Sequence, residues 1–193
     1  MISLKESLII LKETNALLEG HFILSSGLHS SKYVQCAQLL SKPNKAIKIC
    51  ESLAEKIKSE FGNFDLILSP AMGGVIIGYE IGRILKKETI FSERVNNEFQ
   101  LRRDFKINKD SKVLIMEDVI TTGKSSLECS NLVSSINATI VGYACIIDRS
   151  NGKSLIKDKI VSQIELNIPT FAENNLPVEL SKIEPVKPGS RNL

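Results

Sequence analysis

Short apolar runs alternate with amphipathic segments along most of the chain. The apolar runs have the length of buried strands and cover residues 65–69, 113–116, 139–147 and 160–164. Between them, apolar residues recur at helical spacing over 43–61, 75–85 and 124–136. This alternation predicts an α/β fold with a mainly parallel sheet flanked by helices, in which ligand-binding turns follow the carboxyl ends of the strands.

The two ends of the chain depart from the alternation. Ser3 and Glu6 form a capping-box pattern, which predicts a helix from there to Gly20. Elsewhere the pattern predicts short strands at 21–24 and 33–35 around a Ser- and Gly-rich connection, a short helix at 176–183 and an extended tail at 187–193.

The stretch 113–126 carries the most specific chemical pattern. Its apolar run ends at the neighbouring acids Glu117 and Asp118, and a hydroxyl-rich turn at 121–125 then leads into a helix. Free backbone N–H groups and the positive end of the helix dipole favour anions at such a helix start. The turn therefore predicts a phosphate site.

The acids limit which phosphate compound fits this site. The letters Thr-Gly-Lys-Ser at 122–125 resemble the end of a nucleoside-triphosphate P-loop, but the first glycine of that motif would fall on Asp118. Carboxylates would repel a triphosphate here, whereas they suit sugar hydroxyls with a divalent metal nearby. The alternative interpretation is a solvated acidic turn between a strand and a helix.

Three other segments carry candidate chemistry. The turn 70–74 contains two adjacent glycines, which let the backbone approach a ligand at a helix start. The polar segment 92–104 is by itself typical of an exposed hairpin, and it contains Arg94, Arg102 and Arg103. Arg149 follows the last long apolar run directly after an aspartate, a pattern that is usually a surface ion pair but that also suits a planar carboxylate ligand.

The acid pair, the hydroxyl-glycine turn and the apolar run before them resemble the binding motif for phosphoribosyl diphosphate (PRPP) in the type I phosphoribosyltransferases. In many members of this family a lysine occupies the turn that here contains Met72. The resemblance implies that PRPP contacts Glu117, Asp118, Val119, Ile120, Thr121, Thr122, Gly123, Lys124, Ser125, Ala71, Met72 and Gly73.

Within that family the chain resembles the shorter-loop bacterial orotate phosphoribosyltransferases. Their hood over the base has a similar Phe-x-Leu-x-Ser-Gly stretch, matched here by Phe22, Leu24, Ser26 and Gly27. The resemblance implies a single domain, 1–193, in which residues 1–40 contribute to the hood. It also leaves open whether His29 or Lys32 approaches the ligand, and it implies that orotate contacts Thr121, Arg149, Ser26 and Gly27.

The resemblance further implies the reaction. The phosphoribosyl group of PRPP would pass to orotate, giving orotidine 5′-monophosphate and pyrophosphate in pyrimidine (UMP) biosynthesis. Segment 92–104 would be a mobile catalytic loop, and the catalytic residues would be Glu117, Asp118, Arg94, Arg102 and Arg103. Mg²⁺ would arrive on PRPP without a direct protein ligand, and the protein would be a homodimer with shared active sites. The alternatives are a phosphoribosyltransferase for another base and a PRPP-sensing regulatory protein.

Composition excludes several other classes. The net charge is only +3 and the basic residues are dispersed, so no nucleic-acid partner is expected. The longest uncharged stretch, 66–79, is shorter than the roughly 20 residues needed to span a bilayer, so no membrane association is expected. The four cysteines are scattered and the first residues lack a signal-peptide pattern, which predicts a cytoplasmic protein with reduced thiols.

Overall fold

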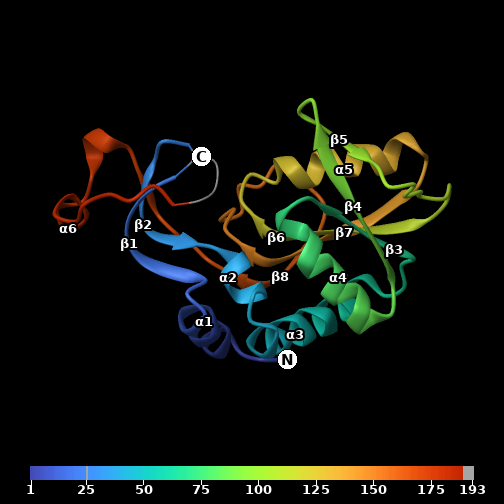
Figure 1. The fold of residues 1–193 in the computed structure, drawn as a ribbon, viewed down its shortest axis with the longest axis horizontal. Coiled ribbons are helices and arrows are strands. Elements are labelled where there is room, and N and C mark those ends of the chain that lie inside the picture. Colours follow the sequence, from blue (N-terminus) through green and yellow to red (C-terminus); the bar gives the residue numbers. More distant parts are fainter. Residues whose placement is uncertain (25, 189–193) are drawn as a thin grey trace.

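The computed structural model describes residues 1–24 and 26–188 and contains a sheet core beside a smaller hood (Figure 1). The six-stranded sheet has the order β5-β4-β3-β6-β7-β8, and only the β4–β5 pair is antiparallel. Its strands are β3 Leu66–Pro70, β4 Glu88–Val95, β5 Glu98–Leu101, β6 Lys112–Ile120, β7 Thr139–Asp148 and β8 Ile160–Glu165. The predicted α/β class with a mainly parallel sheet is confirmed.

Helices cover both faces of this sheet (Figure 1). The side chains of β6 alternate between two buried clusters, because successive residues of a strand point to opposite faces. Leu114 and Met116 pack with α3 and α4, whereas Val113 and Ile115 pack with α5. The helices are α1 Leu4–Glu13, α2 Cys36–Leu40, α3 Pro43–Phe61, α4 Gly73–Leu85, α5 Lys124–Ser135 and α6 Val178–Ser181.

The register of the parallel strands brings three chain segments to one edge of the sheet. β3 and β4 are in register at Pro70, and β6 and β7 are in register at Ile120 and Asp148. The turn 71–74, the turn 121–125 and Arg149 all follow these strand ends directly. In an open α/β sheet this carboxyl edge is where ligands bind.

The hood is built from both ends of the chain. Its three antiparallel strands are β1 Leu17–Ile23, β2 His29–Val34 and β9 Thr170–Phe171. A further bridge joins Phe22 of β1 to Val186, and a 3₁₀ turn at Glu173–Asn175 and α6 lie between β9 and that bridge. Residues 1–40 supply two of the hood strands, and the C-terminal part of the chain completes it.

The first helix is shorter than the sequence predicts. Its capping box is present, since the Ser3 hydroxyl accepts from the Glu6 N–H and the Glu6 carboxylate accepts from the Ser3 N–H. The prediction that the helix continues to Gly20 is wrong. The Thr14 hydroxyl donates to the carbonyl oxygen of Ile10, and Asn15 at φ 58° turns the chain into β1. Local polar bonds thus end the helix before the apolar pattern does.

The central strand is longer than predicted. β6 continues through the acids to Ile120, so Glu117 and Asp118 lie within the strand instead of after its end. The polar segment 92–104 begins as an ordered β4–β5 hairpin, in which Arg94 pairs with Phe99. Residues 189–193 of the predicted extended tail, and Ser25 of the connection before β2, lie outside the described residues.

Candidate active site

The acid pair is buried near the carboxyl end of β6. Glu117 is only 9% exposed, and burial together with the neighbouring Asp118 raises its pKa to about 9. Burial also raises the pKa of Asp118, although its Oδ1 accepts a 2.8 Å hydrogen bond from the Val119 N–H. At neutral pH the free protein therefore holds a proton on this pair. A ligand that supplies hydroxyl donors or positive charge would favour the ionised forms.

The turn after β3 lies directly against the acid pair. A Cβ atom added to Gly73 would fall 2.7 Å from Asp118 Oδ1, so only glycine fits at this position. The Ala71 N–H donates to the carbonyl oxygen of Ser92 at 2.8 Å, which ties the turn to β4. Met72 is exposed beside it. The structure thus brings together the two predicted PRPP-binding segments 71–73 and 117–118.

The turn 121–125 has the conformation expected of an anion site. Thr121 and Thr122 are exposed, and Gly123 adopts φ 79° at the N-cap of α5. Gly123 at the N-cap has no side chain that could cap α5, and the Lys124 N–H donates to the Thr122 hydroxyl oxygen at 3.3 Å. The next N–H groups of the first turn, those of Ser125 and Ser126, are suited to a ligand. Lys124 begins the helix, and its exposed ammonium lies 3.9 Å from Glu128.

A loop after Arg149 supports this turn, and sequence reasoning missed it. The Leu155 N–H donates to the Thr122 carbonyl oxygen at 2.9 Å. A Cβ atom at Gly123 would fall 2.6 Å from the Ser154 hydroxyl and 2.8 Å from Ile156. A run of small polar residues after Arg149 carries no pattern specific for this contact, so only the fold reveals it.

Arg149 follows β7 at the same edge. Its N–H donates to the Ile120 carbonyl oxygen at 2.8 Å, and its buried Nε has no hydrogen-bond partner among the described residues. Burial lowers the pKa of Arg149, and the nearby Tyr33 of the hood opposes that shift. Since buried donors are nearly always paired, this guanidinium is suited to an anionic ligand. Sequence reasoning missed Tyr33, which donates to Gln35 Oε1 at 2.9 Å.

The hood residues occupy the turn between β1 and β2. Ser26 and Gly27 are exposed, and Gly27 has φ 80°. The open question about the neighbouring basic residues has a structural answer within the hood. His29 is buried against His21, and Lys32 lies 3.8 Å from Glu19. Both side chains are thus engaged by hood residues.

Two of the three predicted catalytic arginines, Arg94 and Arg103, contact carboxylates of their own chain. Arg94 stacks 4.2 Å from the Phe99 ring centroid and forms an ion pair with Glu128 of α5. Arg103 makes two 3.0 Å hydrogen bonds to Glu93, and Arg102 is exposed. The described contacts do not join these arginines to the acid pair, so their action on a ligand requires the ion pairs to open.

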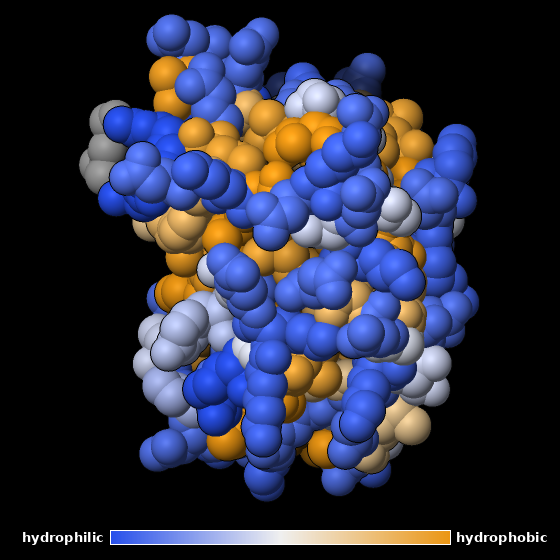
Figure 2. Space-filling model, turned by 90° about the vertical axis from the view of Figure 1, so that its right-hand side faces the viewer, coloured by the Kyte–Doolittle hydropathy of each residue, from blue (hydrophilic) through white to orange (hydrophobic). Residues whose placement is uncertain are grey.

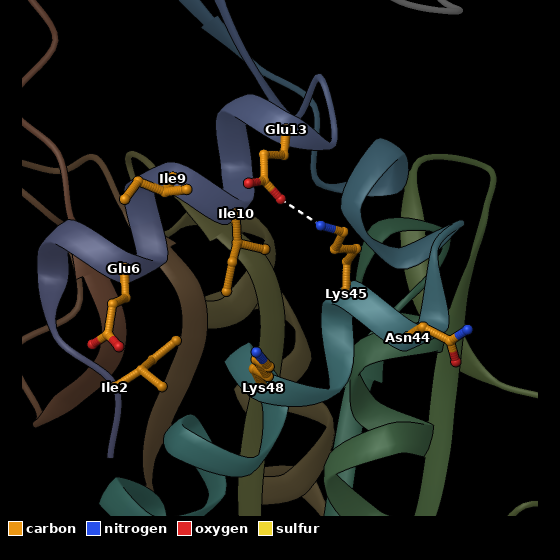
Figure 3. Close-up of a pocket in the computed structure, with 8 residues that line it drawn as sticks. All are labelled: Ile2, Glu6, Ile9, Ile10, Glu13, Asn44, Lys45 and Lys48. Atoms are coloured by element: carbon orange, nitrogen blue, oxygen red, sulfur yellow. Dashed lines mark hydrogen bonds and ion pairs between the residues drawn. The ribbon is translucent and has the colours of Figure 1, made fainter.

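A surface groove lies elsewhere, between α1 and the start of α3 (Figure 3). It has a volume of about 440 Å³, and an ion pair between Lys45 and Glu13 crosses it. None of the predicted site residues lines it, and its lining consists of Ile2, Glu6, Ile9, Ile10, Glu13, Asn44, Lys45 and Lys48. The groove therefore adds nothing to the site at the sheet edge.

The surface is mixed in character. Figure 2 shows the face away from the hood, where hydrophobic side chains lie scattered among hydrophilic ones.

Over residues 1–24 and 26–188, no helix is both long and apolar enough to cross a bilayer. Within the same ranges, no cluster of three or more His, Cys, Asp or Glu side chains could hold a metal ion.

Comparison with known proteins identifies the family. Residues 36–182 match the phosphoribosyl transferase domain family. Orotate phosphoribosyltransferase from Parvibaculum lavamentivorans is 45% identical over 188 residues, covering 95% of this chain and 97% of the relative. The enzyme of that name from Maricaulis maris is 42% identical over 189 residues, covering 97% of both chains.

The chain belongs to the orotate phosphoribosyltransferase family. The crystal structure of orotate phosphoribosyltransferase from Aeropyrum pernix superimposes with a TM-score of 0.72 at 23% identity, covering 82% of this chain and 92% of that one. This likeness shows the phosphoribosyltransferase fold. The predicted membership is confirmed, while the roles of individual residues stay predictions.

The raised pKa of Glu117 predicts a stability difference for the variant Glu117→Gln. The folded protein keeps the Glu117 proton up to a pKa of about 9, whereas the unfolded chain releases it near 4.5. The parent's free energy of unfolding therefore decreases as pH rises between these values. Glutamine cannot ionise, so we expect the variant to be more stable than the parent at pH 8.5, on the order of 5 kcal/mol at roughly 1.4 kcal/mol per pH unit, and nearly equal to it at pH 4.5. Urea unfolding at both values measures this, and a constant difference would contradict it.

Proposed function

We propose that this protein is an orotate phosphoribosyltransferase, which transfers the 5-phosphoribosyl group of PRPP to orotate. The products are orotidine 5′-monophosphate and pyrophosphate, and the reaction belongs to pyrimidine biosynthesis. Relatives at 42–45% identity over nearly the whole chain carry this name.

One observation carries the choice of base. Arg149 places a buried Nε, unpaired within the described part of the chain, at the same sheet edge as the phosphate turn and near Tyr33 of the hood. Orotate differs from uracil by a carboxylate, and a planar guanidinium binds a carboxylate through two parallel hydrogen bonds. The exposed turn with Ser26 and Gly27 would cover the base, and Thr121 would contact it from the sheet.

The PRPP site follows from the two turns and the acid pair. The N–H groups of 121–125 at the start of α5 would hold the 5′-phosphate. The backbone of 71–73 would hold the pyrophosphate, since Gly73 leaves no side chain between the turn and Asp118. Glu117 and Asp118 would accept hydrogen bonds from the ribose hydroxyls.

The reaction requires positioning and charge control instead of a protein nucleophile. Substitution at the ribose C1 develops positive charge on the sugar, and nearby carboxylates favour that charge. The two carboxylates offer oxygen donors of the kind that Mg²⁺ prefers but too few to enclose it, which fits an ion carried by PRPP. Bound Mg²⁺ would neutralise charge on the pyrophosphate.

The hairpin arginines would act on closure. Release of Arg94 from Glu128, and of Arg103 from Glu93, would free positive charge for the pyrophosphate, together with Arg102. The movement of segment 92–104 would also exclude water from the sugar cation. Glu128 also lies near Lys124, so the ion-pair partner of Arg94 is on the helix that begins at the phosphate turn.

The direct test is a coupled assay for pyrophosphate release with PRPP, Mg²⁺ and a panel of bases. We expect turnover of orotate, with uracil and adenine each lower by at least about tenfold, because neither has the carboxylate that Arg149 binds. Equal turnover of orotate and uracil would contradict the choice of base. Absence of pyrophosphate release with every base would favour a PRPP-binding regulator.

We propose a homodimer with shared active sites, in which the outer face of α4 contacts a second copy. Ile76 and Tyr79 are 54% and 66% exposed on this helix, and they continue from Met72, which is 84% exposed in the pyrophosphate turn. The stripe is therefore continuous with the active site. An interface there would place each subunit beside the other's pyrophosphate turn.

This assembly predicts that Tyr79→Glu converts the dimer to a monomer and greatly reduces activity. A charge in an apolar interface is left desolvated and unpaired, which disfavours association. Analytical ultracentrifugation measures the mass, and Ile9→Glu on the exposed face of α1 is the matched control, which should stay dimeric. A fully dimeric Tyr79→Glu variant would contradict this interface.

We also propose a cytoplasmic location. The cysteines Cys36, Cys50, Cys129 and Cys145 are buried and unpaired, which suits a reducing compartment. Fractionation of cells that produce the protein would test this.

A further inference from the structure

The hood contains a buried pair of histidines, and they are the only 2 histidines in the chain. His21 on β1 is 3% exposed, and His29 at the start of β2 is 5% exposed. Nε2 of His21 lies 2.6 Å from Nδ1 of His29, and Nδ1 of His21 lies 2.8 Å from the carbonyl oxygen of Ile183. The contacts form one hydrogen-bonded chain from β2 across β1 to the C-terminal segment.

The geometry determines where the protons lie when both rings are neutral. The Ile183 carbonyl oxygen can only accept, so Nδ1 of His21 carries the hydrogen. Nε2 of a neutral His21 is then an acceptor, so Nδ1 of His29 must donate to it. Both rings are therefore Nδ1–H tautomers.

The pair lies at the base of the turn that carries Ser26 and Gly27. His29 is opposite Ile23 across the β1–β2 ladder, and one step further the Leu24 N–H donates to the Leu28 carbonyl oxygen at 2.8 Å. This hydrogen bond closes the turn, and the histidine pair lies one ladder position before it. The orientation of the tip thus depends on how the two strands are held at the histidines.

The same two residues connect the turn to the rest of the hood. His29 is also opposite Phe171 of β9, and the Val186 N–H donates to the carbonyl oxygen of His21 at 2.8 Å. We propose that His21 and His29 are positioning residues, which hold Ser26 and Gly27 over the base by fixing the ends of β1 and β2 to residues 183–186. This inference rests on the proposed function, because the role of the turn in covering orotate comes from it.

A measurement without substrate tests the proton arrangement. With only 2 histidines, the ring-¹⁵N NMR spectrum of the tag-free protein contains two spin systems, and single variants assign them. When both rings are neutral we expect both as Nδ1–H tautomers, with one N–H proton shifted by a short hydrogen bond. An Nε2–H tautomer at His21 would overturn the proposal, because that ring could not donate to Ile183.

Kinetics test the positioning role. His29→Leu removes the donor and leaves Nε2 of His21 without a partner, so we expect KM for orotate to rise about tenfold, the scale of one lost hydrogen bond. KM for PRPP and kcat should stay within about twofold, because the PRPP turns are built on the sheet core. Ser31→Ala, on the same strand, is the control and should behave like the parent.

A conservative variant separates positioning from simple loss of structure. The amide of His29→Gln can still donate to His21, so this variant should recover most of the affinity for orotate even if His29→Leu folds poorly. Loss of affinity for both substrates together, or failure of the glutamine to rescue, would overturn the positioning role. If the parent turns over no orotate, the proposed function itself fails, and the NMR result still decides whether the histidine chain exists.

Discussion

Asp118→Asn should fold normally and lose about 100- to 1,000-fold in kcat. The substitution keeps the size of the side chain but removes the charge that we propose acts on the ribose, and a preorganised electrostatic contact of this kind contributes about 2.7–4 kcal/mol to catalysis. Burial raises the pKa of Asp118, so ionisation of this side chain is unfavourable to folding. We therefore expect the variant's Tm at neutral pH to equal or exceed that of the parent.

The control is Asp110→Asn, in an exposed turn before β6 where φ is 71° and asparagine is well tolerated. It should leave both activity and Tm unchanged. Steady-state kinetics and thermal unfolding of the two variants together give the answer. If Asp118→Asn stayed within about twofold of the parent kcat, the charge would not act on the reaction, and the acid pair would be structural.

Arg149→Leu should raise KM for orotate much more than KM for PRPP. Loss of one partner from a buried charge pair costs on the order of 2–5 kcal/mol, which corresponds to a rise of about 30-fold or more. The Arg149 Nε has no hydrogen-bond partner within residues 1–24 and 26–188, so leucine should not lower the Tm. A higher KM for orotate at an unchanged Tm would show that the substitution affects binding of orotate and not the stability of the fold.

Arg149→Lys is the informative companion to this variant. Lysine keeps the charge but cannot form two parallel hydrogen bonds, so we expect an intermediate KM for orotate. Both variants should turn over uracil about as poorly as the parent does, because uracil presents no carboxylate. Equal increases in KM for orotate and PRPP would instead assign Arg149 to the structure of the sheet edge.

The sheet core could be predicted from the sequence because its signals are local and agree with one another. The helix at 43–61 matches α3 at both ends, where Pro43 occupies a favourable first position. The apolar runs and glycine turns likewise place the ends of β3 and β6 within a few residues. In these elements the local secondary-structure propensity and the burial of apolar side chains favour the same conformation, so the sequence pattern predicts the observed structure.

The features that sequence reasoning missed depend on contacts between distant residues. Nothing near Thr14 indicates that the chain turns into β1, because the interaction that stabilises this turn is the pairing of β1 with β2. The support of Gly123 by Ser154, and the approach of Tyr33 to Arg149, exist only after the sheet has formed. The ion pair of Arg94 with Glu128 likewise joins a hairpin to a helix 34 positions later, which no local pattern encodes.

The construction of the hood from both chain ends has a consequence for synthesis on the ribosome. His21 and its partner Ile183 are separated by 162 positions, and β2 meets β9 only after all of the sheet core has been made. Contacts of such long range form late in folding, and during translation they must wait for the last residues to emerge. We therefore expect a nascent chain to form the sheet core with its turns at 71–74 and 121–125 first, and to complete the hood around Ser26 and Gly27 only near release.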